Sequence, residues 1–167
     1  MHADWLIPDW PVPANVRAVF TTRHGGVSSP PWNTLNLGDH VGDVAENVAA
    51  NRTQVQNVLK ARAVFLQQVH GQAVLALDPA TPDGLPFDAC VTTQRATACT
   101  IMVADCLPVL LASADGTVVA AAHAGWRGLA GQSDGYGVLE SVFAAFYASF
   151  SPTAPVKRAE SAIEIIA

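Results

Sequence analysis

The chain has 167 residues, of which 50% are hydrophobic and 14% are charged. A chain of this length can bury about 70% of its unfolded surface, and a charged fraction well below the usual ~25% excludes intrinsic disorder. Nine Lys and Arg against fourteen Asp and Glu give a net charge of −5. The basic residues are scattered along the sequence, so a nucleic-acid-binding groove is not expected.

The sequence predicts neither export nor membrane insertion. Residues 1–10 have neither the basic start nor the apolar stretch of a secretory signal. The longest apolar stretches are interrupted by Asp105 and Asp115, so no membrane span is expected. An odd number of cysteines cannot all pair within one chain, which favours free thiols in a cytoplasmic protein. The cysteines are Cys90, Cys99 and Cys106.

The predicted secondary structure contains both strands and helices. Residues 1–150 are expected to form a single domain. Residues 151–167 begin with a Pro-interrupted stretch and are expected to form a divergent C-terminal tail, whose last twelve residues suit a short helix. The predicted helices cover 44–61, after a capping-box spacing at Asp43 and Glu46, and 137–149; predicted strands cover 17–22, 63–69, 73–77, 89–93 and 98–103.

An antiparallel hairpin is predicted over residues 109–123, where two apolar runs flank Asp115-Gly116. If these two residues form the turn, cross-strand partners have numbers that sum to 231, so His123 faces Pro108. Cys106 is then the diagonal neighbour of His123 on the same face, within about 7 to 8 Å. A bulge at Pro108 would shift this register.

The hairpin therefore suggests that a thiol and an imidazole converge, and a second histidine, His70, ends a predicted strand. Two imidazoles and a thiolate suit Zn²⁺, and three protein ligands leave the fourth position open for water or substrate. The spacings match no short zinc motif. The residues alone favour a plainer interpretation, in which Cys106 is a small buried hydrophobic residue and both histidines form hydrogen bonds at strand ends. A third alternative is a cysteine hydrolase that uses Cys106, a histidine and Asp105.

Two polar residues flank this group. Asp105 precedes Cys106 and, on a regular strand, points to the opposite face; it is a candidate general base or a simple turn carboxylate. Arg127 follows His123 by four residues and can meet an anion near the metal. Both are assigned candidate catalytic roles.

Two further residues are candidates for substrate binding. Arg23 belongs with Gly25, Gly26, Ser28 and Ser29 to a loop that suits an anion cradle, although an exposed loop arginine is usually only solvated. Trp126 can stack on a planar base, but packing in the core is the favoured interpretation.

Five segments occur in an order that resembles the YfiH-like family, also called laccase-domain or polyphenol oxidoreductase proteins. They are TTRHGGVSS (21–29), NLGDHVGD (36–43), FLQQVHG (65–71), ADCLPVLL (104–111) and AAAHAGWRGL (120–129). The resemblance implies an α/β sandwich of mixed, largely antiparallel sheets with flanking helices. It also implies zinc ligation by His70, Cys106 and His123, because the family's ligands are the His of QVHG, the Cys of ADC and the His of HAGWRG.

The resemblance further implies an enzyme of purine nucleosides. Such enzymes cleave adenosine, inosine and methylthioadenosine with phosphate to base and sugar 1-phosphate, and they deaminate adenosine. The family name suggests copper, but the five histidines of this chain are too few for a blue-copper centre and a trinuclear cluster together. Zn²⁺ is therefore expected rather than Cu²⁺. Copper-dependent phenol oxidation, the cysteine hydrolase and a non-catalytic zinc-holding interaction module are the alternatives.

The family pattern stops after Gly131, whereas family members continue into a further α/β segment that helps to enclose the pocket. The chain therefore resembles a member that is incomplete at its C-terminus. Helix 137–149 has an aromatic-rich side that has to be covered. It either folds back over the hairpin or packs against a second copy, and we expect self-association.

Overall fold

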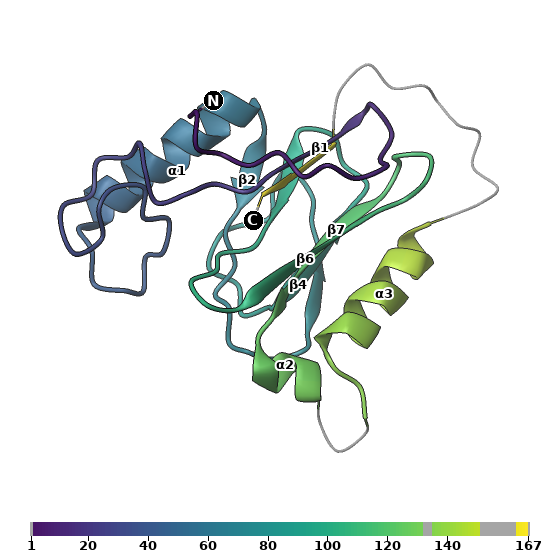
Figure 1. Ribbon diagram of the computed structural model, residues 1–167. Helices are drawn as coiled ribbons and strands as arrows, with labels where there is room; N and C mark the ends of the chain where they lie inside the picture. Colours follow the sequence, from purple (N-terminus) through teal and green to yellow (C-terminus); the bar gives the residue numbers. More distant parts are fainter. Residues whose placement is uncertain (1, 132–134, 151–162, 167) are drawn as a thin grey trace.

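The computed structural model describes residues 2–131, 135–150 and 163–166, and its strands form two four-stranded sheets (Figure 1). The first sheet has the order β1-β8-β5-β2, and the second has the order β3-β4-β7-β6. The strands of the first sheet are β1 (Val16–Val19), β8 (Ile163–Ile166), β5 (Thr97–Thr100) and β2 (Arg62–Val64). Those of the second are β3 (Val74–Ala76), β4 (Ala89–Thr92), β7 (Val119–Ala124) and β6 (Leu107–Ala112).

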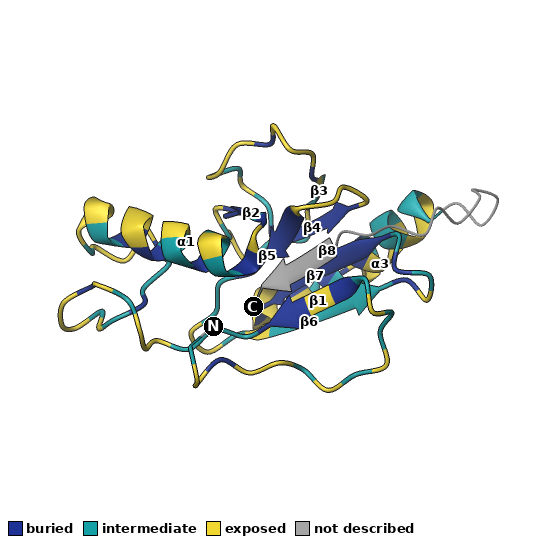
Figure 2. Cartoon of the chain, turned by 90° about the horizontal axis from the view of Figure 1, so that it is seen from above, coloured by how far each residue is buried: buried dark blue, intermediate teal, exposed yellow. Residues whose placement is uncertain are grey.

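One buried cluster joins the two sheets face to face. It contains residues from strands of both sheets and from positions one or two residues after a strand: Val16, Ala18, Val64, Leu66, Leu77, Cys90, Cys99, Ile101, Val119 and Ala121. In Figure 2 the strands β4, β5 and β7 are coloured as buried, whereas β6 is mostly intermediate. The expected α/β sandwich of mixed sheets is therefore confirmed.

The expected predominance of antiparallel pairing is wrong. The sheet β1-β8-β5-β2 is parallel throughout, and β3 also runs parallel to β4. Only the β4-β7-β6 part is antiparallel. Local sequence shows a hairpin, because its turn lies between its strands, but it does not show which distant strand a parallel strand selects.

Helix α1 (Ala45–Leu59) covers the outer face of the first sheet and confirms the helix predicted there. Its buried residues recur every three or four positions, as an amphipathic helix requires; they are Val48, Asn51, Val55 and Leu59. The predicted capping box is absent. Asp43 instead accepts hydrogen bonds from the Val44 N–H, at 2.7 Å, and from the Asn36 amide, at 2.9 Å.

Helix α3 (Val138–Ser149) covers the outer face of the second sheet, and its buried residues Val138 and Val142 pack against β4 and β7. The helix therefore folds back over the sheet, which is one of the two arrangements expected for it. None of the helices in the described ranges is long and apolar enough to cross a lipid bilayer.

The C-terminal residues 163–166 form β8, so the short helix expected for the last twelve residues is wrong at these positions. The sequence Ile-Glu-Ile-Ile is rich in β-branched residues, which favour strands, and two neighbouring strands, β1 and β5, pair with it. Residues 151–162 and 167 of the expected tail lie outside the described residues.

Candidate metal centre

The β6–β7 hairpin has the predicted register, because Pro108 pairs with His123 and Leu107 pairs with Ala124. The paired residues run without a bulge from 107 to 112 and from 119 to 124. The connection is longer than the expected two-residue turn. The Asp115 carboxylate accepts hydrogen bonds from the hydroxyls of Ser113, at 2.6 Å, and Thr117, at 2.8 Å, which closes the loop 113–118.

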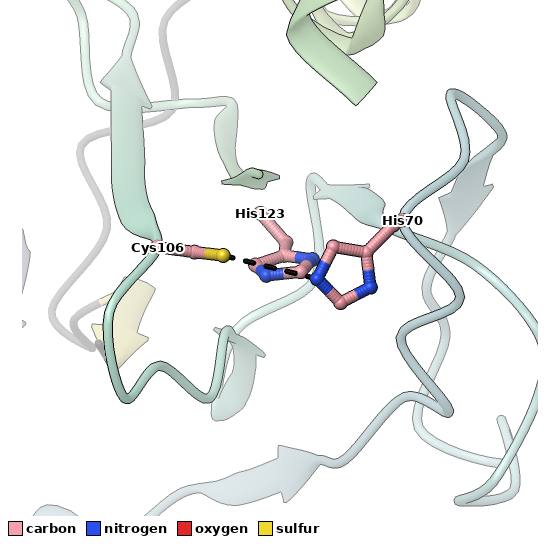
Figure 3. Close-up of side chains that lie close together, drawn as sticks. All are labelled: His70, Cys106 and His123. Atoms are coloured by element: carbon pink, nitrogen blue, oxygen red, sulfur yellow. Dashed lines mark hydrogen bonds between the residues drawn. The ribbon is translucent and has the colours of Figure 1, made fainter. Parts of the chain in front are cut away.

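The side chains of His70, Cys106 and His123 converge (Figure 3). One potential ligand atom from each lies within 4.8 Å of the others. The Cys106 Sγ is 3.8 Å from the His70 Nε2, and the two imidazole rings lie 4.7 Å apart at 77°. In tetrahedral zinc a sulfur and a nitrogen ligand are about 3.6 Å apart. The donor types and their spacing therefore fit one Zn²⁺.

His70 lies in the loop after β2, because the strand expected over 63–69 ends at Val64. Its backbone is left-handed, with φ +60°, which is uncommon for a residue with a side chain. The Asp88 carboxylate holds this loop by accepting the N–H groups of Val69, at 3.2 Å, His70, at 2.8 Å, and Gly71, at 2.7 Å.

His123 is buried on β7, and its ring also contacts Asp88. The His123 Nδ1 lies 2.9 Å from the Asp88 Oδ1. Burial alone would raise the pKa of Asp88, but the hydrogen bonds from His123, Gly71, His70 and Val69 outweigh it and lower the pKa below its usual value. Sequence reasoning missed Asp88. The only available signal was an acidic residue directly before a predicted strand.

Cys106 lies one residue before β6 and is half-buried. The exposed carboxylate of Asp105 is 3.7 Å from the Cys106 Sγ. The prediction that Asp105 points to the opposite face is therefore wrong, because both residues precede the regular strand. Without a metal, partial burial and the negative charge of Asp105 raise the pKa of the Cys106 thiol.

Gly125 closes the other side of the ligand group. A Cβ at this position would lie 2.8 Å from the His70 Cδ2, 3.3 Å from the Cys106 Sγ and 3.5 Å from the His123 Cε1. Only a residue without a side chain leaves the three ligands their present positions. The sequence showed Gly125 as part of a turn and gave no sign of this contact.

The ligand group lies at one wall of a cavity of about 650 Å³, a size typical of small-molecule sites. Residues from the segments 20–23, 31–41, 68–70 and 100–106 line it together with His123. Arg23 and Asp105 are among them, so the structure brings these two predicted residues to the same cavity as the ligands.

The prediction that the glycines of the loop 23–29 help to form an anion cradle is wrong, because their N–H groups are already used within the protein. The N–H groups of Gly25 and Gly26 donate to the Thr34 hydroxyl, at 3.0 and 3.1 Å. The guanidinium of Arg23 donates to the carbonyls of Pro31, at 3.0 Å, and Asn33, at 2.7 Å. The loop therefore uses its donors to hold its own shape.

Asn51, which sequence reasoning missed, fixes this loop to α1. It is completely buried, accepts the Val27 N–H at 2.9 Å, and donates to the Ser28 hydroxyl and the Asn36 carbonyl, both at 2.9 Å. A buried amide with all these partners is a structural anchor for the cavity wall.

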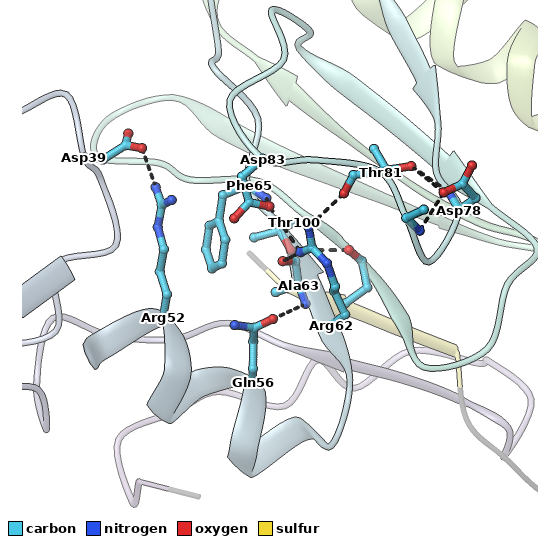
Figure 4. A network of polar contacts seen from close by, with 12 residues as sticks. Asp39, Arg52, Gln56, Arg62, Ala63, Phe65, Asp78, Thr81, Asp83 and Thr100 are labelled. Atoms are coloured by element: carbon cyan, nitrogen blue, oxygen red, sulfur yellow. Dashed lines mark hydrogen bonds and ion pairs between the residues drawn. The ribbon is translucent and has the colours of Figure 1, made fainter. Parts of the chain in front are cut away.

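Arg52 fixes a second part of the cavity wall (Figure 4). Its guanidinium donates to the Leu37 carbonyl at 2.8 Å, lies 3.3 Å from the Asp39 carboxylate and stacks 4.2 Å above the Phe65 ring. Consecutive residues of one helix thus hold two parts of the wall.

Trp126 and Arg127 do not line the cavity. They begin the short helix α2 (Trp126–Ala130), where Trp126 is 72% exposed and the Arg127 guanidinium lies 5.2 Å from its ring. The favoured prediction that Trp126 packs in the core is wrong, because the chain turns outward after the buried Gly125. Their roles in catalysis and substrate binding stay predictions.

Residues 17–157 match a family model described as multi-copper polyphenol oxidoreductase laccase. The chain belongs to this YfiH-like, laccase-domain family. It is 52% identical over 137 residues to a purine nucleoside phosphorylase of Pseudomonas aeruginosa, covering 82% of the chain and 54% of that protein. It is 45% identical over 143 residues to the purine nucleoside phosphorylase YfiH of Escherichia coli, covering 84% and 57%.

Solved structures of the YfiH-like family share the fold. A Neisseria meningitidis protein with 47% identity has a TM-score of 0.80 and is matched over 86% of this chain and 57% of its own. YlmD of Geobacillus stearothermophilus, with 32% identity, has a TM-score of 0.69 over 78% and 53%. The chain thus spans little more than half the length of these relatives, so their names do not by themselves assign it an activity.

The family's description names several copper ions, but the described part of this chain does not hold enough ligand groups for several metal ions. There, one group of three or more potential ligands occurs, and it consists of His70, Cys106 and His123. The other histidines, His2, His24 and His40, do not join it. A trinuclear copper cluster therefore lacks ligands among the described residues.

Proposed function

We propose that the chain binds one Zn²⁺ through His70, Cys106 and His123 and is an enzyme that cleaves purine nucleosides with phosphate to base and sugar 1-phosphate. The observation that carries this proposal is the convergence of the three side chains at a cavity, in a chain 52% identical to a purine nucleoside phosphorylase. Zinc with three protein ligands supplies Lewis acidity at an open fourth position.

The chain's own residues are assigned supporting roles. Asp105, an exposed carboxylate beside Cys106, can accept a proton from an attacking oxygen at the cavity wall. Arg23 provides positive charge at the same cavity for a phosphate oxygen. Arg127 and Trp126 lie on α2 directly after Gly125, and we propose that they meet the phosphate and the base, respectively.

The proposed substrates are adenosine, inosine and methylthioadenosine, and deamination of adenosine is a proposed second activity. Incubation of the zinc-loaded chain with adenosine, followed by chromatography, separates the two reactions. Phosphorolysis gives adenine only when phosphate is present, whereas deamination gives inosine without phosphate. Loss of both products in His123→Ala would connect them to the ligand group. Absence of both products from the zinc-loaded wild-type chain would refute catalysis.

A non-catalytic role as a zinc-holding interaction module is the second candidate. It is favoured by the position of Trp126 and Arg127, which do not line the cavity beside the ligand group. This role predicts stoichiometric zinc without turnover. A cysteine hydrolase predicts instead a metal-free enzyme inactivated by thiol alkylation, and copper-dependent phenol oxidation predicts activity that returns with copper but not with zinc.

We also propose a cytoplasmic location. The structure leaves Cys90, Cys99 and Cys106 as free thiols, and a reducing compartment would keep Cys106 available as a ligand. Fractionation of cells that produce the chain, with a periplasmic marker protein as reference, tests this location.

A further inference from the structure

Asp88 is a completely buried carboxylate that connects two of the three ligand-bearing segments. Its Oδ1 contacts the His70 N–H at 2.8 Å and the His123 Nδ1 at 2.9 Å. Its Oδ2 accepts the N–H groups of Val69 at 3.2 Å and Gly71 at 2.7 Å. One side chain thus holds both the loop of His70 and the ring of His123.

The backbone of Asp88 strengthens this connection. Its carbonyl accepts the His123 N–H at 2.7 Å, and its N–H donates to the Ala73 carbonyl at 3.2 Å. Asp88 is therefore fixed at the start of β4, between the loop 69–73 and β7. Its carboxylate cannot shift without breaking contacts to both segments.

The ring contact selects one tautomer of His123. A carboxylate can only accept, so the His123 Nδ1 has to carry the proton that faces it. The lone pair of the same ring then lies on Nε2, the atom left for a metal. The three N–H contacts to the loop hold His70 in its left-handed backbone, with φ +60°.

We infer that Asp88 is a positioning residue that prepares His70 and His123 for metal binding before the metal arrives. This inference rests on the proposed metal function and adds to it how the site is built. Groups that orient metal-binding imidazoles change metal affinity without contacting the metal, by about 10- to 100-fold. Asp88 acts on two of the three ligands at once.

The change Asp88→Asn tests the inference with a side chain of the same size. If the amide oxygen takes the Oδ1 position, the NH₂ group faces the donors of Val69 and Gly71. If it takes the Oδ2 position, the NH₂ group faces His70 N–H and the His123 Nδ1, and the ring has to move its proton to Nε2. Both orientations disturb a metal ligand.

We expect Asp88→Asn to weaken zinc binding by about 10- to 100-fold in competition with a chromophoric chelator. The control is Asp115→Asn, which removes a hydrogen-bonding carboxylate from the far end of the β6–β7 hairpin. It should leave zinc affinity unchanged. Equal zinc affinity in folded Asp88→Asn and wild type would overturn the inference and would indicate a role in stability alone.

A second measurement needs no variant and no zinc. In metal-free wild-type protein labelled with ¹⁵N-histidine, NMR should show that the neutral His123 ring carries its proton on Nδ1, which faces Asp88. A neutral ring with its proton on Nε2 would overturn the inference, even if Asp88→Asn fails to fold. Failure of the wild-type chain to bind zinc would refute the proposed function, whereas the tautomer of His123 still decides the role of Asp88 in the protein.

Discussion

Pro108 faces His123 across the β6–β7 hairpin as a pair without hydrogen bonds between the two strands. The His123 N–H points away from β6 and donates to the Asp88 carbonyl, at 2.7 Å. In an antiparallel ladder, residue pairs that exchange hydrogen bonds alternate with pairs that do not. Pro108 belongs to a pair of the second kind, so its missing N–H removes no hydrogen bond from the ladder. This explains why Pro108 causes no bulge and why Cys106, two residues earlier, reaches the histidine.

Zinc should be present in about one equivalent in the purified chain, and Cys106→Ala should remove it, because two imidazoles alone bind zinc far more weakly than a set with a thiolate. Metal analysis of both proteins checks this result. The control His24→Ala removes an exposed histidine outside the ligand group and should retain the metal. A zinc-free wild-type chain that folds normally would contradict the prediction.

Zinc affinity should rise with pH between about 6 and 8. The pKa of Cys106 is raised in the metal-free chain by partial burial and by Asp105, so the thiol is protonated at neutral pH. Binding therefore releases its proton, and affinity should increase by about tenfold per pH unit from this group. Isothermal titration calorimetry in buffers of different ionisation enthalpy measures the released protons. A pH-independent affinity would show that Cys106 is not a ligand.

Gly125→Ala should weaken zinc binding, although Gly125 has no side chain that could bind the metal. Its backbone, with φ −72° and ψ 155°, suits any residue, so strain plays no part. The added Cβ would instead approach the His70 Cδ2 to 2.8 Å and displace that ring. We expect a loss of about tenfold or more in affinity. Gly38→Ala, whose Cβ would meet its nearest atom at 3.5 Å, is the matched control.

Asn51→Ala should lower the free energy of unfolding by about 2 to 4 kcal/mol, because it leaves the Val27 N–H and the Ser28 hydroxyl without their buried partner. Gln54→Ala, which loses one hydrogen bond from the same helix to the Gly25 carbonyl, should cost less than about 1.5 kcal/mol. Urea unfolding compares the two. Equal costs would argue against a special role of Asn51.

The outer face of α3 is expected to mediate self-association. Phe143 and Tyr147 are 60% and 70% exposed and stack with their ring centres 6.5 Å apart. Light scattering should detect association that the double change Phe143→Gln and Tyr147→Gln reduces. Since both rings lie away from the sheet, the double variant should keep its unfolding midpoint. A wild-type chain that stays monomeric and binds no hydrophobic dye would refute this expectation.

Elements whose signal is local could be predicted from the sequence. The spacing of Val48, Val55 and Leu59 predicted α1, and Asp115-Gly116 predicted the hairpin and its register. That register predicted the approach of Cys106 to His123. The resemblance to the family then favoured the metal interpretation over the plainer one that the residues alone supported.

Contacts between distant segments could not be predicted in the same way. Asp88, Asn51 and Gly125 act through side-chain or backbone contacts to residues far away in the sequence, and each is an ordinary residue in its own local context. The strand at 163–166 was missed for a related reason. A four-residue segment rich in isoleucine becomes a strand only when β1 and β5 are available to pair with it.

The position of β8 has a consequence for the order in which the protein can fold. Val16 of β1 pairs with Ile163, 147 positions later in the sequence, whereas Arg62 of β2 pairs with Thr97, only 35 positions away. Closing the longer loop costs more entropy and is slower. During synthesis the β2–β5 pair can form early, but residues 16–19 have to wait for 163–166. A strand made early thus stays without its strand partner until β8 has been synthesised.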